Sequence, residues 1–73
     1  MRDLFIDALK RKYEAEIAAG KATAKVYFDK PVAIGEHPQF LDELDKVLTK
    51  ISNAEEKLET LTKHYPTDDD IPF

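Results

Sequence analysis

Apart from its carboxylates, this sequence has few side chains of the kinds that catalyse reactions or bind metal ions. Cysteine is absent, and the two histidines, His37 and His64, fall near opposite ends of one helical segment. Ser52 is the single serine and has no histidine near it, so nothing supports a Ser-His-Asp triad. The lack of thiols excludes disulfides and thiolate zinc sites. We therefore expect a protein that is not an enzyme and that needs no metal or cofactor.

The charged residues of the helical segments have the pattern of solvated helix faces. Lys10, Arg11 and Lys12 are consecutive, so on a helix they point in different directions, which favours a solvated surface over a phosphate-binding patch. The carboxylates between residues 42 and 59 alternate with lysines, which is also typical of a solvated face. The formal net charge of −4 argues against direct binding of nucleic acid.

The last seven residues carry the most specific chemical pattern. They hold three acidic residues and no basic one, so they contribute −3 of the net charge, and they finish with Ile-Pro-Phe. Apolar residues at the end of an acidic segment gain nothing unless a partner buries them. Pro72 restricts the last dipeptide, which lowers the entropy lost on docking. A partner could enclose the ring of Phe73 in an apolar pocket while a cationic side chain binds its α-carboxylate, and a basic rim could attract the aspartates.

This segment, Asp68-Asp69-Asp70-Ile71-Pro72-Phe73, resembles the C-terminal tip of bacterial single-stranded DNA-binding protein (SSB), with six identical consecutive residues at the end of the sequence. The resemblance implies a docking peptide for genome-maintenance proteins, with exonuclease I, RecQ, RecO, PriA and the chi subunit of DNA polymerase III as candidate partners. It implies that Phe73 and its carboxylate are the anchor, that Ile71 and Pro72 support it, and that Asp68, Asp69 and Asp70 supply electrostatic attraction.

The resemblance to SSB covers the tip and not the body of the chain. SSB has an OB-fold of β-strands that stacks bases on aromatic side chains, whereas this chain has no strand-like alternation and no tryptophan. The run Ile34-Gly35-Glu36-His37-Pro38 resembles part of short uncharacterised helical proteins of T4-like phages. This second resemblance implies a phage protein and supplies no function of its own. With no secretory signal or membrane span in the sequence, we expect the protein to act in the cytoplasm of a bacterial host.

Apolar and small residues recur at helical spacing from residue 3 to residue 29. They step by three or four residues, as expected for one helical face: Ile6, Leu9, Tyr13, Ile17, Gly20, Ala24 and Tyr27. Asp3 is a candidate N-cap. Gly20 has two interpretations, which the sequence leaves open. It is either a weak point or kink in the helix, or a place where a second helix approaches closely.

A heptad pattern occupies the second segment. Steps of four and three residues connect Phe40, Leu44, Val47, Ile51, Ala54, Leu58, Leu61 and Tyr65. Leu41 and Leu48 widen this apolar stripe on one flank, as helices in bundles require. Pro38 suits the first turn of a helix, and Pro66 disfavours helical backbone at the residue before it.

These patterns predict an all-α protein, an antiparallel two-helix hairpin over about residues 3–29 and 38–65. Residues 1–66 would form the hairpin and residues 67–73 a disordered docking peptide. Two helices bury one strip against each other, so Tyr27, Phe28, Phe5, Leu41 and Leu48 cannot all be covered in one chain. We expect either a homodimer that forms a four-helix bundle or docking of the hairpin onto another protein. No run is apolar enough to span a membrane, and the charged N-terminal residues are unlike a secretory signal.

Three functions are compatible with this organisation. The first is a small adaptor or inhibitor whose SSB-like tip occupies the SSB-tail pocket of bacterial replication, repair or recombination proteins. The second is a structural or assembly coiled-coil protein, for example a phage component, whose tail is incidental or an engineered fusion. The third, an acidic mimic of DNA, is less favoured because the chain outside the tail has a net charge of only −1.

Overall fold

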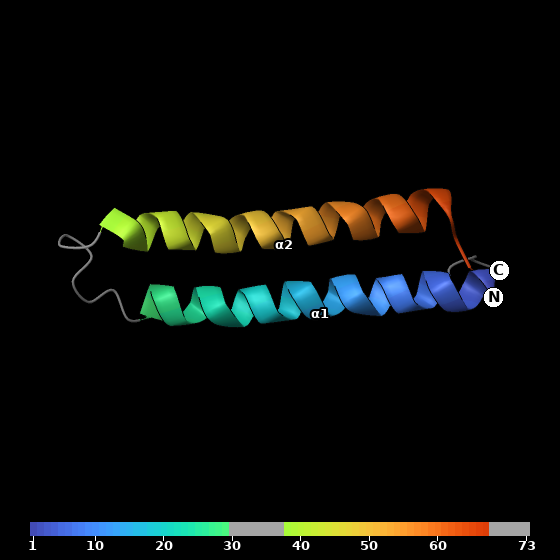
Figure 1. Ribbon diagram of the computed structural model, residues 1–73, viewed down its shortest axis with the longest axis horizontal. Coiled ribbons are helices and arrows are strands. Elements are labelled where there is room, and N and C mark those ends of the chain that lie inside the picture. The colour runs from blue at the N-terminus through green and yellow to red at the C-terminus, as the bar shows by residue number, and fades with distance from the viewer. Residues whose placement is uncertain (30–37, 68–73) are drawn as a thin grey trace.

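The computed structural model describes residues 1–29 and 38–67, and it shows two long helices packed against each other. Helix α1 is Arg2–Asp29 and helix α2 is Pro38–His64. The helices run antiparallel and lie side by side along their length (Figure 1). The predicted all-α hairpin is therefore confirmed. The predicted connection between the helices, including Pro31, Gly35 and the apolar Val32 and Ile34, lies outside the described residues.

The helix ends differ slightly from the predicted ones. Helix α1 begins at Arg2, so Asp3 lies inside the first turn and the assignment of Asp3 as N-cap was wrong. At this position the carboxylate of Asp3 still interacts favourably with the positive end of the helix dipole. Helix α2 begins at Pro38, as predicted, because the missing N–H of proline costs nothing in a first turn. It ends at His64, one residue before the predicted end, since Pro66 disfavours helical backbone at Tyr65.

The core is a single strip between the two helices. Four apolar side chains in it are buried: Ile6, Ala24, Leu44 and Ala54. Tyr27 and Phe40 extend the strip at the end where α1 stops and α2 starts. Their rings meet edge to face, with centroids 5.3 Å apart and an interplanar angle of 81°, the geometry that the aromatic quadrupole favours. The strip is small for an independent fold, because chains of this size seldom bury enough apolar area in one core.

Gly20 lies at a close approach of the two helices. Helix α1 continues through this residue without interruption. A Cβ atom at Gly20 would lie 2.5 Å from Cγ1 of Ile51, which is well below the ordinary contact distance of 3.4–4 Å. The structure therefore supports the close-approach interpretation of Gly20. The missing side chain makes room for Ile51, which compensates for the lower helix propensity of glycine.

Large apolar side chains remain exposed on the hairpin. Four of the five side chains for which the sequence predicts incomplete cover are exposed, with exposed fractions of 65% for Phe5, 61% for Phe28, 63% for Leu41 and 46% for Leu48. Tyr27, the fifth, is half-buried. Met1, Leu4 and Val26 are also exposed. Among the described residues, neither helix combines the length and the apolar character needed to cross a membrane.

Candidate partner-binding site

The predicted docking peptide, Asp68, Asp69, Asp70, Ile71, Pro72 and Phe73, lies outside the described residues, but its base is described. After α2, residues 65–67 turn across the end of the hairpin toward the start of α1 (Figure 1). Thr67 is buried, with an exposed fraction of 8%. A buried side chain therefore lies three residues beyond the end of α2.

Backbone hydrogen bonding continues for one residue beyond α2. The N–H of Tyr65 donates to the carbonyl oxygen of Leu61 at 2.9 Å. The imidazole of His64 contacts the Tyr65 ring, with centroids 6.4 Å apart. Lys63 and His64 occupy the last turn of α2, and the ammonium of Lys63 interacts favourably there with the negative end of the helix dipole. The base of the tail is therefore attached to an ordered helix end.

Two open grooves follow the seam between the helices, in the half that contains the start of α1 and the end of α2. The larger one, of about 570 Å³, is lined by Ile17, Glu55, Leu58, Glu59, Thr62 and Lys63. The smaller one, of about 340 Å³, is lined by residues that include Tyr13, Lys57, Leu61 and Tyr65. Lys57 and Glu59 are the neighbours of Leu58, so they lie about 100° to either side of it. The grooves therefore lie on opposite sides of the seam. We call them the Glu59 groove and the Lys57 groove.

A cation and two tyrosines meet in the Lys57 groove. The Lys57 ammonium lies 5.9 Å from the centroid of the Tyr13 ring, within the range of a cation–π contact. Tyr65 lines the same groove and leaves 55% of its surface exposed. The contact joins the two helices through the seam, and it uses a lysine that the sequence places among solvated charges.

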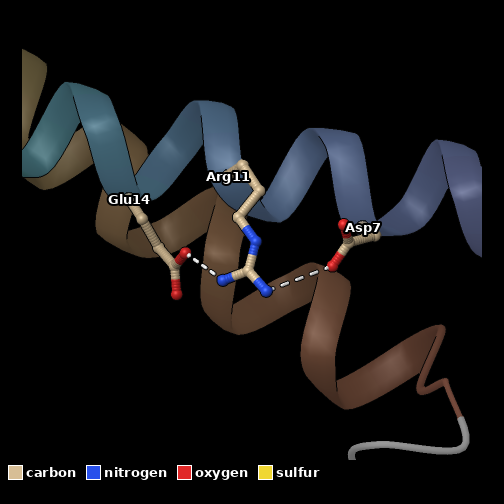
Figure 2. Close-up of polar contacts among 3 residues, drawn as sticks. All are labelled: Asp7, Arg11 and Glu14. Carbon is tan, nitrogen blue, oxygen red and sulfur yellow. Dashed lines mark hydrogen bonds and ion pairs between the residues drawn. The ribbon is translucent and has the colours of Figure 1, made fainter.

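The basic run of α1 is neutralised in part by local carboxylates. Arg11 lies between Asp7 and Glu14, with Nη2 3.5 Å from Asp7 Oδ1 and Nη1 3.1 Å from Glu14 Oε1 (Figure 2). All three side chains are at least half exposed. Such surface pairs contribute little to stability. Their spacing of one helical turn agrees with the interpretation of this run as a solvated face rather than a phosphate site.

The structure brings most of the predicted seam residues between the two helices. Ile6, Ala24 and Leu44 are buried, and a larger group is half-buried: Tyr13, Ile17, Phe40, Val47, Ile51, Leu58 and Leu61. Two predicted seam residues differ. Leu9 is 38% exposed because its position lies at the edge of the stripe, and Tyr65 is 55% exposed because it follows the last helical residue.

Within the described ranges, no group of three or more His, Asp or Glu side chains is placed to hold a metal ion. His64 is exposed at the end of α2, and His37 lies outside the described residues. Ser52 is exposed on α2. The helices contact each other through apolar side chains, and their surfaces carry ion pairs between residues one turn apart. One such pair joins Lys25 Nζ and Asp29 Oδ2 at 2.7 Å.

Sequence reasoning missed two features of this site. The burial of Thr67 has no signal in residue type, because threonine before an acidic run is usual in exposed tails. The Tyr13–Lys57 contact depends on the axial register of the two helices, which the spacing of apolar residues along each helix does not specify.

Comparison with known proteins adds no relative to this description. No protein-family model, curated protein or solved structure matches the chain.

Proposed function

We propose that this chain is a non-enzymatic docking protein. Its helical hairpin carries a C-terminal peptide that binds the SSB-tail pocket of bacterial replication, repair or recombination proteins. The observation that carries the proposal is the run Asp68-Asp69-Asp70-Ile71-Pro72-Phe73, which is identical over six residues to the SSB tip. The candidate partners are those that the resemblance implies: exonuclease I, RecQ, RecO, PriA and the polymerase III chi subunit. The place of action is the cytoplasm of a bacterial cell, with a phage as the source of the gene.

The physical chemistry of the tip supports this proposal. In a chain that ends at Phe73, this residue offers both an aromatic ring and an α-carboxylate, so it can supply an apolar and a charged contact together. The three aspartates give the tip a concentrated negative charge that accelerates association with a basic surface. Pro72 limits the conformations lost on binding.

The described part of the chain supports a display role for the hairpin. The buried Thr67 ties the base of the tip to the hairpin end, directly after an ordered helix. The helices carry pairs of opposite charge one turn apart on exposed surfaces, an arrangement without the converging polar groups that catalysis requires. A stable helical carrier and a short acidic peptide are sufficient for docking.

Binding to exonuclease I tests the proposal. The full chain, ending at Phe73, is titrated into the enzyme by isothermal titration calorimetry. We expect one binding event per chain, which a free peptide of the sequence Asp-Asp-Asp-Ile-Pro-Phe competes away. Deletion of Phe73 removes both the ring and the terminal carboxylate next to it, so binding should be lost. One alanine added after Phe73 keeps the ring but moves the carboxylate, so it should also weaken binding strongly.

Phe5→Ala is the matched control, because Phe5 is an exposed phenylalanine at a distant position in the sequence. This variant should bind like the unmodified chain. Binding that survives deletion of Phe73, or that Phe5→Ala abolishes, would contradict the proposal. The same titrations with RecQ and the chi subunit then rank the candidate partners.

An assembly role is the second candidate, and the exposed Phe28, Leu41 and Leu48 favour it. In that case the helices are the functional surface and the tail is incidental. Truncation after Thr67 separates the two functions, since it removes the tip and keeps every described residue. An assembly protein keeps all its interactions after this truncation, whereas a docking protein loses them.

A further inference from the structure

The chain between the hairpin and the apolar end of the docking peptide is short. Thr67 is buried, with an exposed fraction of 8%, and three aspartates separate it from Ile71. Extended chain spans at most about 3.5 Å per residue, so the four steps from Thr67 to Ile71 reach about 14 Å at most. This limit is little more than the diameter of one helix, about 10–12 Å. A protein that encloses Ile71, Pro72 and Phe73 is therefore held against the end of the hairpin.

This proximity affects how tightly the docking peptide is bound. A hairpin end that only excludes the partner would make the chain bind more weakly than the peptide alone. An end with a surface that the partner covers would make the chain bind more tightly, because the second contact forms at the high effective concentration that a short tether gives. The side chains next to Thr67 decide between these two results.

Tyr65 is the exposed aromatic residue closest in sequence to the docking peptide within the described part of the chain. Its exposed fraction is 55%. Its N–H donates to the carbonyl oxygen of Leu61, so its backbone is held by α2, and its ring contacts the imidazole of His64. A tyrosine held in this way loses little conformational entropy when a partner covers it, and tyrosine is one of the residues that contribute most to protein interfaces.

The Lys57 groove lies beside this ring. It has a volume of about 340 Å³, and Leu61 and Tyr13 line it together with Tyr65. One carboxylate, that of Glu56, and one ammonium, that of Lys57, also line the groove, so its net charge is zero. The ammonium already faces the Tyr13 ring, 5.9 Å from its centroid. The groove therefore fits an apolar or aromatic side chain better than it fits an ion.

Other exposed apolar side chains at the same end of the hairpin have no such cavity beside them. Met1, Leu4 and Phe5 are exposed, but they line neither the Lys57 groove nor the Glu59 groove. A partner side chain inside the Lys57 groove is enclosed on more than one side, so it buries more apolar surface there than it would against these three residues. The groove is therefore the favoured surface for a second contact.

We propose that the Lys57 groove and the ring of Tyr65 form a second contact with the protein that binds the docking peptide, and that they receive an apolar side chain from its surface next to the tip pocket. This inference rests on the proposed function and adds to it a surface of the hairpin. The hairpin then contributes directly to the affinity, in addition to displaying the peptide.

Calorimetric titration into exonuclease I tests this contact by comparing the full chain with the free peptide Asp-Asp-Asp-Ile-Pro-Phe, acetylated at its N-terminus. The chain should bind about tenfold more tightly than the peptide, the size expected for one well-covered aromatic side chain at an interface. Tyr65→Ala should remove this advantage. Phe28→Ala is the matched control, because Phe28 is an exposed aromatic residue near the end of α1 farthest from Thr67, and it should keep the advantage.

A longer tether tests the same contact without altering the hairpin. Inserting about twenty glycine and serine residues between Thr67 and Asp68 keeps every described residue and makes the tail about four times as long. The effective concentration of the second contact then falls about eightfold, if it follows the −3/2 power of the length. The advantage over the peptide should fall from about tenfold to about twofold. In a Tyr65→Ala chain the same insertion should change nothing.

The outcomes separate this inference from the proposed function. A peptide that does not bind exonuclease I would contradict both of them. If the peptide binds, a chain that binds no more tightly than the peptide would overturn the second contact alone. An advantage that survives Tyr65→Ala or the insertion, or one that Phe28→Ala removes, would overturn it as well.

Discussion

Replacing Gly20 by alanine should destabilise the hairpin, although alanine is the better helix former. The added Cβ would lie 2.5 Å from Cγ1 and 3.2 Å from Cδ1 of Ile51. The first distance is about 0.9 Å short of the lower limit of an ordinary contact, 3.4 Å. Cγ1 is next to the β-carbon of a β-branched side chain, so it cannot move away by itself. The helices must separate, or Ile51 must leave its rotamer.

Two opposing terms set the expected magnitude. Alanine gains about 1 kcal/mol over glycine in a helix interior, and overpacking of a well-packed contact costs about 1–3 kcal/mol. The free energy of unfolding should therefore fall by up to about 2 kcal/mol in Gly20→Ala. In an Ile51→Ala background the atoms that clash are gone. There the same substitution should raise the free energy of unfolding by about 1 kcal/mol, so its sign reverses.

Urea denaturation followed by circular dichroism measures both effects, with all variants at one protein concentration, because an oligomer's stability depends on concentration. Ala22→Gly is the control on the exposed face of the same helix. It should cost about 1 kcal/mol in either background, since it has no contact with Ile51 in this geometry. A Gly20→Ala variant that is more stable than the parent, or that has the same effect with and without Ile51, would refute the close approach of the helices.

Three further results are expected. Ala54→Leu adds volume at the most buried side chain of the core, which is 3% exposed, and should lower the free energy of unfolding by about 1–3 kcal/mol, while Ala15→Leu at an exposed position should change it little in the same denaturation assay. A double-mutant cycle that replaces Tyr27 and Phe40 by leucine should give a coupling of about 0.5–1.5 kcal/mol from their edge-to-face contact, and zero coupling would contradict that geometry. Binding of the acidic tip to exonuclease I should weaken steadily as sodium chloride is raised, since the aspartates act through screened charge; an affinity independent of salt would assign binding to the apolar residues alone.

The sequence was sufficient to predict the helices, because each is specified by residues close together in the chain. Helix α2 begins at Pro38 and ends one residue from the predicted position, as expected when prolines lie near both of its ends. The start of α1 was predicted less well, because Asp3 is as acceptable within a first turn as before it.

Features that depend on how the two helices are aligned could not be predicted from the sequence. Gly20 had two interpretations until its position opposite Ile51 was known. The contact of Lys57 with Tyr13 requires the same alignment. The same distinction applies to the candidate site. The docking peptide is predicted from the order of six residues, whereas the burial of Thr67 depends on where α2 ends relative to α1 and could not be predicted.

The start of α1 and the end of α2 lie at the same end of the hairpin, and this position determines how the protein responds to force (Figure 1). Tension applied between the start of α1 and Thr67 would open the hairpin from that end, separating the contacts of the seam one after another as a zipper opens. The first contacts to separate would be those of Ile6, and the last would be the ring pair of Tyr27 and Phe40. Tension applied across opposite ends would instead load the whole seam at once, in shear. A partner that pulls on the tip while the N-terminus is held therefore meets the mechanically weaker direction of this fold.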